Sequence, residues 1–111
     1  MAEIERKEVV LSTAAQTDIK AAFVFGSETF GFIAAKAFVA EVYMSIWSLD
    51  YQYNMHPGCR FLTTKSKIYH NIIQGSYLII YRITNKRVEV LRVLNSRVSI
   101  RKIRGASGTK V

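Results

Sequence analysis

The spacing of apolar residues changes partway along this chain, from a period typical of helices to one typical of strands. Between Phe32 and Leu49, apolar residues recur at alternating steps of three and four, which places them on one face of an α-helix. From Thr63 onward they fall into short runs rich in β-branched and aromatic residues, a composition typical of β-strands. A chain with the two periods in separate halves is predicted to be an α+β protein, with helices before most of its sheet.

The first half is predicted to contain a strand and a helical hairpin. Glu8–Ser12 is a short β-branched strand that ends in a hydroxyl residue suited to cap a helix. A first helix is expected from about Thr13 to Gly26, and a second from Phe32 to Leu49, with Gly31 in the break between them. A short break makes the two helices antiparallel. The loop that leaves the hairpin is expected over Asp50–Gly58.

The second half is predicted to form a three-stranded antiparallel meander, with turns at Gln74-Gly75 and Asn85-Lys86. The strands are expected over Lys65–Ile72, Ser76–Ile83 and Arg87–Leu94. Together with the first strand they form one sheet, and the hairpin lies across one of its faces. We expect a single domain over residues 1–111, with a core of about 8–104 and a frayed tail over 105–111. Tyr77 and Tyr81 share one strand face and are predicted to be in the core.

Charge is divided unevenly along the chain. The protein has 16 Lys and Arg against 8 Asp and Glu, a net charge of +8. Residues 1–59 carry a net −3, whereas residues 60–111 carry +11 because Glu89 is their single acidic residue. A segment as basic as residues 60–111 attracts a polyanion or an acidic protein partner. The alternative is a solvated surface that maintains solubility.

The residue inventory argues against several classes of protein. One cysteine, Cys59, cannot form an intramolecular disulfide, and two histidines without a Cys-x-x-Cys motif give no structural zinc site. We expect no metal and no cofactor. The most apolar stretch, Gly31–Leu49, contains Lys36 and Glu41, so it is predicted to be an amphipathic helix rather than a membrane span. A cytoplasmic protein without a membrane partner is expected.

Four segments carry a resemblance to a known family. They are VVLSTAAQTDI at 9–19, HPGCR at 56–60, GSYLIIYRI at 75–83 and VEVLRVLNSR at 88–97. Their order and spacing resemble the RelE/ParE superfamily of toxins from bacterial type II toxin–antitoxin systems. The resemblance implies a small toxin that a cognate antitoxin wraps and neutralises. RelE-like members cut messenger RNA on the ribosome, whereas ParE-like members poison DNA gyrase.

The residues at the catalytic positions of RelE-like ribonucleases differ in this chain. Leu78 stands where the resemblance would place an arginine, and Tyr69 and Asn71 stand near the positions of paired lysines. The segment Val98–Val111 contains no tyrosine and no histidine, and Arg97 alone matches a basic position of the ribonucleases. The resemblance therefore implies a ParE-like toxin that binds gyrase and is not itself a hydrolase.

Two alternatives stay open at the level of sequence. One is a ribosome-dependent, metal-free messenger RNA endonuclease, in which phosphate stabilisation and proton transfer would fall to Arg97, Arg82, Lys67 and His70. The other is a degenerate family member without toxicity. His70 has two possible roles at this level: a proton-transfer group, or a packing residue, which is the more common role of a lone histidine in an amphipathic strand.

The candidate binding residues for the antitoxin or the target are all basic. They are Arg82, Arg92, Arg97, Arg60, Lys65 and Lys67. Arg82, Arg92 and Arg97 are expected to cluster beside the meander and to pair with antitoxin carboxylates; pairing with Glu89 or solvation is the alternative for the first two.

The other predicted contacts are less specific. Arg60 is expected to fix the loop by bonding backbone carbonyls, while Lys65 and Lys67 are expected to share a strand face. Met44 and Trp47 are predicted to bury against antitoxin or a second protomer. A homodimer and a heterotetramer with the antitoxin both stay open.

Overall fold

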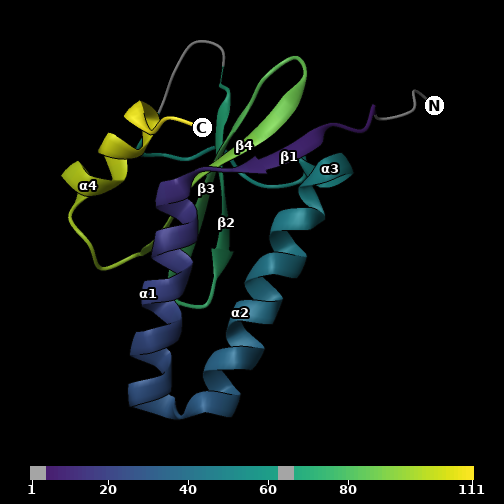
Figure 1. The fold of residues 1–111 in the computed structure, drawn as a ribbon. Coiled ribbons are helices and arrows are strands. Elements are labelled where there is room, and N and C mark those ends of the chain that lie inside the picture. Colours follow the sequence, from purple (N-terminus) through teal and green to yellow (C-terminus); the bar gives the residue numbers. More distant parts are fainter. Residues whose placement is uncertain (1–4, 63–66) are drawn as a thin grey trace.

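The computed structural model describes residues 5–62 and 67–111 as one helical hairpin packed on a four-stranded sheet (Figure 1). Its elements are β1 (Glu8–Leu11), α1 (Thr13–Phe30), α2 (Phe32–Trp47), α3 (Leu49–Gln52), β2 (Tyr69–Gln74), β3 (Tyr77–Ile83), β4 (Arg87–Asn95), α4 (Ile100–Arg104) and the 3-10 helix η1 (Gly105–Gly108). The predicted α+β class is confirmed, as is the order of strand, helical hairpin and meander.

α1 begins where the sequence predicts and ends later. The Ser12 hydroxyl accepts a hydrogen bond from the backbone of the first turn and caps the helix. Gly26, the expected end, lies inside the helix, because its missing side chain lets α2 approach. A Cβ at Gly26 would lie 3.3 Å from that of Ala35. The chain reverses at Gly31, whose φ of 95° is accessible to glycine and costly for other residues.

α2 ends two residues before the predicted boundary at Leu49. The Ser48 hydroxyl donates to the carbonyl of Ser45 at 2.7 Å, a local bond that competes with regular helix. The predicted loop from Asp50 to Gly58 therefore begins inside α3, which buries Leu49 completely. The short helix turns the chain toward β1, where the Lys7 amide donates to the Asp50 carbonyl.

The four strands are ordered β1-β4-β3-β2, and the sheet is mixed. β2, β3 and β4 form the predicted antiparallel meander, while β1 pairs with β4 in parallel. A β-bulge shifts the register between Ile80 and Tyr81 of β3. Because the bulge adds a residue to β4, Val90 and Val93 both face the hairpin, although three positions separate them.

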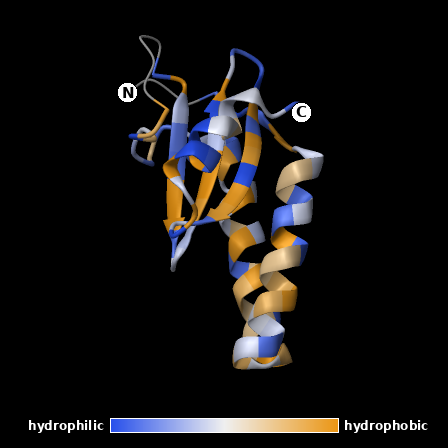
Figure 2. Cartoon of the chain, turned by 90° about the vertical axis from the view of Figure 1, so that its left-hand side faces the viewer, coloured by the Kyte–Doolittle hydropathy of each residue, from blue (hydrophilic) through white to orange (hydrophobic). Residues whose placement is uncertain are grey.

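Apolar clusters cover both faces of the sheet. The larger cluster joins the hairpin to the sheet and includes Ile46, Ile79 and Tyr81, which confirms the core prediction for Tyr81. Tyr77, also predicted to be in the core, is partly buried and packs at the margin of the cluster. The smaller one joins the opposite face to α4 and includes Ile80 and Ile103. The central strands are therefore apolar on both sides, and Figure 2 shows orange over much of the sheet, interrupted by hydrophilic positions.

The strand expected over Lys65–Ile72 begins later, at Tyr69. Lys67 has a φ of 51°, a left-handed conformation that a strand cannot contain, so it does not share a strand face with Tyr69. Lys65 lies outside the described residues, and the expectation for it is not tested.

The C-terminal tail was expected to fray from Gly105, and the structure corrects this. α4 begins after Ser99, whose hydroxyl accepts from the Lys102 amide at 3.2 Å. Residues 105–108 continue as η1, which buries Ala106 against the sheet. The tail folds because Ile103 and Ala106 cover a sheet face that would otherwise expose apolar side chains to water.

The hairpin is longer than the sheet that it covers. Figures 1 and 2 show its closed end extending well past the ends of the strands, and much of this part is apolar. Within the described residues, no helix is long and apolar enough to cross a membrane.

Candidate functional site

Arg82 is held by a carboxylate of the same sheet. It donates from Nε and Nη2 to the same oxygen of Glu89, at 2.8 and 2.6 Å. Arg87 donates to the second carboxylate oxygen at 2.7 Å. Burial alone would raise the pKa of Glu89, but the hydrogen bonds from Arg82 and Arg87 outweigh it and lower that pKa. Arg82 therefore forms the ion pair with Glu89 that was predicted as the alternative to antitoxin binding.

Arg92 is held by a different carboxylate, on α1. Its Nε and Nη2 donate to the two oxygens of Asp18 at 2.7 and 2.8 Å, a bidentate pair. The Asp18 carboxylate also accepts from the Val93 amide at 3.0 Å. β1 ends at Leu11, so Asp18 supplies β4 with a hydrogen-bond partner beyond the end of its neighbouring strand.

Arg97 lies in the loop after β4, beside an apolar cleft. The cleft has a volume of about 410 Å³ and separates the distal hairpin from the β2–β3 turn and the end of β4. It is lined by Ala22, Phe25, Gly26, Phe30, Ala34, Ala35, Phe38, Gly75, Ser76, Tyr77, Asn95 and Arg97. Of these described lining residues, Arg97 is the charged one, and its side chain is exposed. The cleft therefore suits an amphipathic segment with apolar groups and a carboxylate.

The three arginines do not form the predicted cluster. Arg82 pairs with Glu89 near one end of the meander, whereas Arg97 follows the opposite end, where Tyr77 pairs with Asn95. Tyr77 and Arg82 are five positions apart on β3, which corresponds to roughly 16 Å along the strand. The guanidinium groups of Arg82 and Arg92 are hydrogen-bonded to carboxylates of the same chain. Pairing either arginine with a partner protein would first require breaking those bonds.

The four residues of the ribonuclease alternative do not share one site, although Lys67 and His70 line the same cleft. His70 lies across from Tyr81, on the hairpin side, and its ring stacks on Tyr81 with centroids 5.6 Å apart. Arg82 and the fully buried Ile80 alternate with Tyr81 and face the other side. Among the described atoms, His70, Arg82 and Arg97 therefore have no common point of approach to a phosphate.

His70 has a clear packing role. Its Nδ1 lies 2.8 Å from the carbonyl oxygen of His56, and both rings contact Tyr81. The Tyr81 hydroxyl donates to the Tyr53 carbonyl at 2.7 Å, and burial raises the pKa of that hydroxyl. Burial, and then the nearby His70, lower the pKa of His56. This aromatic cluster joins the loop after α3 to the sheet.

Arg60, Lys67 and His70 line a second, smaller cleft between the 57–62 loop and the beginning of β2. The Arg60 guanidinium lies over the Phe61 ring, 4.8 Å from its centroid. The expected bonds from Arg60 to backbone carbonyls are not found among the described atoms. The loop is held by its own backbone instead, since the Cys59 amide donates to the Tyr69 carbonyl at 2.9 Å.

Large apolar side chains are exposed along the hairpin. They are Val24, Phe25, Phe30, Phe32, Ile33, Met44 and Trp47. Met44 and Trp47 are exposed, and their burial against antitoxin or a second protomer stays a prediction; Phe32 was expected in the core stripe and is exposed. An apolar surface of this kind, on one projecting element, is typical of an interaction site.

The phenylalanines of the apolar cleft do not stand out in the sequence. Phe25 and Phe30 were overlooked because they do not share the spacing of the buried residues Ala15, Ile19 and Ala22 of α1. The sequence signal for them is that α1 carries aromatic residues outside the positions that it buries against the sheet and α2. No local pattern links Asp18 to Arg92, because the two residues are 74 positions apart in the chain.

Comparison with known proteins identifies the family of this chain. A family model described as the ParE toxin of type II toxin–antitoxin system, parDE, matches residues 9–99. The chain therefore belongs to the ParE toxin family of type II toxin–antitoxin systems.

A solved structure supports the same fold. A chain from the chromosomal ParDE toxin–antitoxin system of P. aeruginosa superposes with a TM-score of 0.68 at 14% sequence identity. The match covers 82% of this chain and 97% of that chain. No curated protein sequence matches. The resemblance seen in four sequence segments is thus confirmed, on the ParE side of the superfamily.

Proposed function

We propose that this toxin inhibits DNA gyrase by binding to it in the cytoplasm, and that an acidic antitoxin neutralises it by occupying the apolar cleft beside Arg97. The observation that carries the antitoxin proposal is the cleft itself, with exposed phenylalanines on the hairpin and one cation at its margin. An amphipathic helix placed there would bury its apolar side and pair a carboxylate with Arg97.

The free edge of β2 offers a second contact for the same antitoxin. Residues 57–59 cover the first part of this edge, where the Asn71 amide donates to the Pro57 carbonyl at 3.1 Å. Beyond Asn71, no other described strand pairs with β2 on that side, and Ile73 is 70% exposed. An extended segment that follows the antitoxin helix could add as a strand here, through main-chain hydrogen bonds.

Family membership supports gyrase as the target, because ParE-like toxins poison gyrase. Two further features favour binding over messenger RNA cleavage. Arg82 is engaged by Glu89, and Lys67 and His70 line a different cleft from the one that Arg97 lines, so the four candidate residues do not surround one phosphate. The exposed apolar hairpin supplies a protein-binding surface.

We expect Arg97→Ala to weaken antitoxin binding by about 2–5 kcal/mol, because a carboxylate buried in the complex would lose its partner. Arg97→Lys should also weaken it, since lysine cannot reproduce a bidentate guanidinium contact. Isothermal titration of antitoxin into each variant measures the change. Lys86→Ala is the matched control, because Lys86 is exposed in the β3–β4 turn, away from the cleft.

A second variant tests the cleft independently of Arg97. Ala34 lines the cleft and is exposed, so Ala34→Glu should leave the fold intact while placing a negative charge against an acidic antitoxin. If Arg97→Ala and Ala34→Glu both bind like the parent protein, the cleft is not the antitoxin site.

The gyrase proposal is tested with purified components. Saturating toxin should abolish supercoiling of relaxed plasmid by gyrase, and prior addition of antitoxin should restore it. Unchanged supercoiling would contradict the proposal. Primer extension on transcripts from cells that express the toxin covers the ribonuclease alternative, since cuts positioned by codons would point to messenger RNA as the target.

A further inference from the structure

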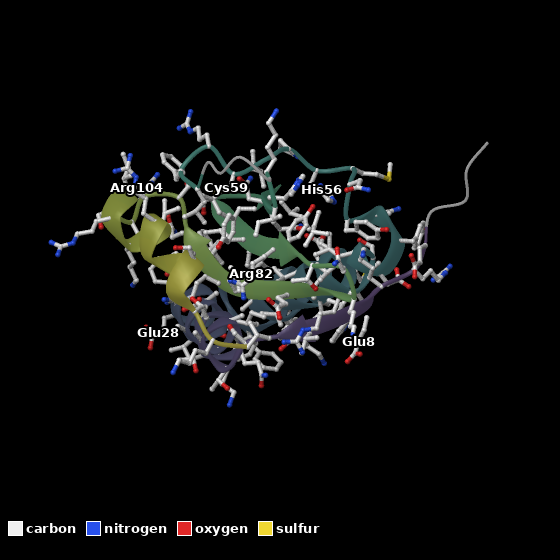
Figure 3. All side chains as sticks on the ribbon, turned by 90° about the horizontal axis from the view of Figure 1, so that it is seen from above. Glu8, Glu28, His56, Cys59, Arg82 and Arg104 are labelled. Carbon is white, nitrogen blue, oxygen red and sulfur yellow. The ribbon has the colours of Figure 1, made fainter. Side chains whose placement is uncertain are left out.

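A group of exposed cations lies on the side of the sheet opposite the hairpin. It is formed by Arg60, Lys67, Arg101, Lys102 and Arg104, and we call it the α4 basic face. Cys59 and Ile103 belong to one buried cluster, which holds the 57–62 loop and α4 beside each other. Figure 3 accordingly shows Arg104 and Cys59 on one side of the molecule, with Glu8 and Glu28 toward the other.

Carboxylates of the sheet do not neutralise these charges. Glu89 already accepts hydrogen bonds from Arg82 and Arg87, so its charge is compensated where it stands. Glu8 lies on β1, at the sheet edge opposite β2, whereas the 57–62 loop covers β2. From residue 90 to the C-terminus the chain has no acidic residue at all. The α4 basic face therefore presents a concentrated positive field.

The geometry points to double-stranded DNA as the ligand of the α4 basic face, bound through its phosphates; we propose this as an activity of the toxin beyond gyrase and antitoxin binding. Arg60 and Lys67 line one cleft of about 290 Å³, and the three cations of α4 project from the neighbouring helix. Cations on separate elements can each contact one phosphate in a row of phosphates. Such contacts do not depend on the base sequence.

The aromatic residues of this face favour a duplex over a single strand. Binding of single strands relies on open aromatic rings against which bases stack. Here the Arg60 guanidinium covers the Phe61 ring at 4.8 Å. Tyr69 and His70 line the cleft but are half-buried, and the His70 ring is already stacked on Tyr81. An acidic polypeptide is the other polyanion that these charges attract, and competition with polyglutamate distinguishes it from a duplex.

Fluorescence anisotropy of a short labelled DNA duplex, titrated with the toxin at several salt concentrations, tests the proposal. The variant Arg101→Ala/Lys102→Ala/Arg104→Ala should bind more weakly and reduce the salt slope by about 2–3, because each phosphate contact contributes about one to it. The matched control, Lys20→Ala/Lys36→Ala/Lys86→Ala, removes the same net charge from exposed positions elsewhere and should keep the parent slope. Arg60→Gln, which leaves α4 untouched, should lower the slope by about one.

Three outcomes would overturn the proposal. The first is an equal loss of binding in both triple variants, which would mean attraction to net charge alone. The second is tighter binding of a single strand or of duplex RNA than of the DNA duplex. The third is displacement of the duplex by polyglutamate at equal charge concentration, which would assign the face to an acidic protein. The assay contains neither gyrase nor antitoxin, so its failure is distinct from failure of the proposed function.

Discussion

Replacing Ile103 with alanine is expected to lower the free energy of unfolding by about 2–5 kcal/mol, the range for removing a buried branched side chain and leaving a cavity. Ile103 is 1% exposed and packs with Ile80 and Leu94 in the cluster between α4 and the sheet. Loss of its side chain removes the main apolar anchor of α4, a helix too short to be stable by itself. Urea unfolding followed by circular dichroism measures the change.

Ile100→Ala is the control for this experiment. Ile100 begins the same helix, but its side chain is 50% exposed, so the same substitution should cost less than about 1 kcal/mol. Equal stabilities of the Ile103→Ala variant and the parent protein would mean that α4 does not contribute to the core.

Glu89→Gln is expected to destabilise the protein by about 2–4 kcal/mol at neutral pH, because it leaves two arginines beside each other without a counter-charge. The Glu89 side chain is 7% exposed and bonds to both Arg82 and Arg87. Glu41→Gln removes the same charge from an exposed position on α2 and should change stability by less than about 0.5 kcal/mol.

The contribution of Glu89 should also depend on pH. Its pKa is lowered in the folded protein from the ordinary value of 4.5, so the folded state favours the ionised carboxylate more than the unfolded state does. The stabilisation is complete above pH 4.5 and is lost as the pH falls below it toward the folded-state pKa. The stability gap between the parent and Glu89→Gln should therefore be constant near neutrality and close in acid. A gap that widens in acid would contradict this role of Glu89.

Local sequence patterns were sufficient for the elements of the fold. The apolar spacing of α2 and the alternation of β3 depend on neighbours a few positions away, and both elements formed close to their predicted bounds. Boundaries shifted where tertiary contacts intervened. Gly26 stayed helical because α2 packs against it, and residues 105–108 became ordered because a sheet face had to be covered.

The candidate site was predicted less well, because the role of an arginine depends on which carboxylate is nearest in space. Arg82 and Arg92 looked alike in sequence, as basic residues within apolar strands. The fold brought Glu89 to the first and Asp18 to the second, and it left Arg97 exposed beside a cleft that neither helix forms alone.

The sequence by itself determined the class of fold, the family and the basic character of the second half, since each of these follows from local periodicity, from segment order or from a count of charges. Only the tertiary structure decided which charges are free to meet a partner. Pairing between Arg92 and Asp18 joins residues 74 positions apart, and α4 becomes part of the core through contacts with distant strands. Hydrogen bonds and apolar packing act over a few ångströms in space, whatever the separation along the chain.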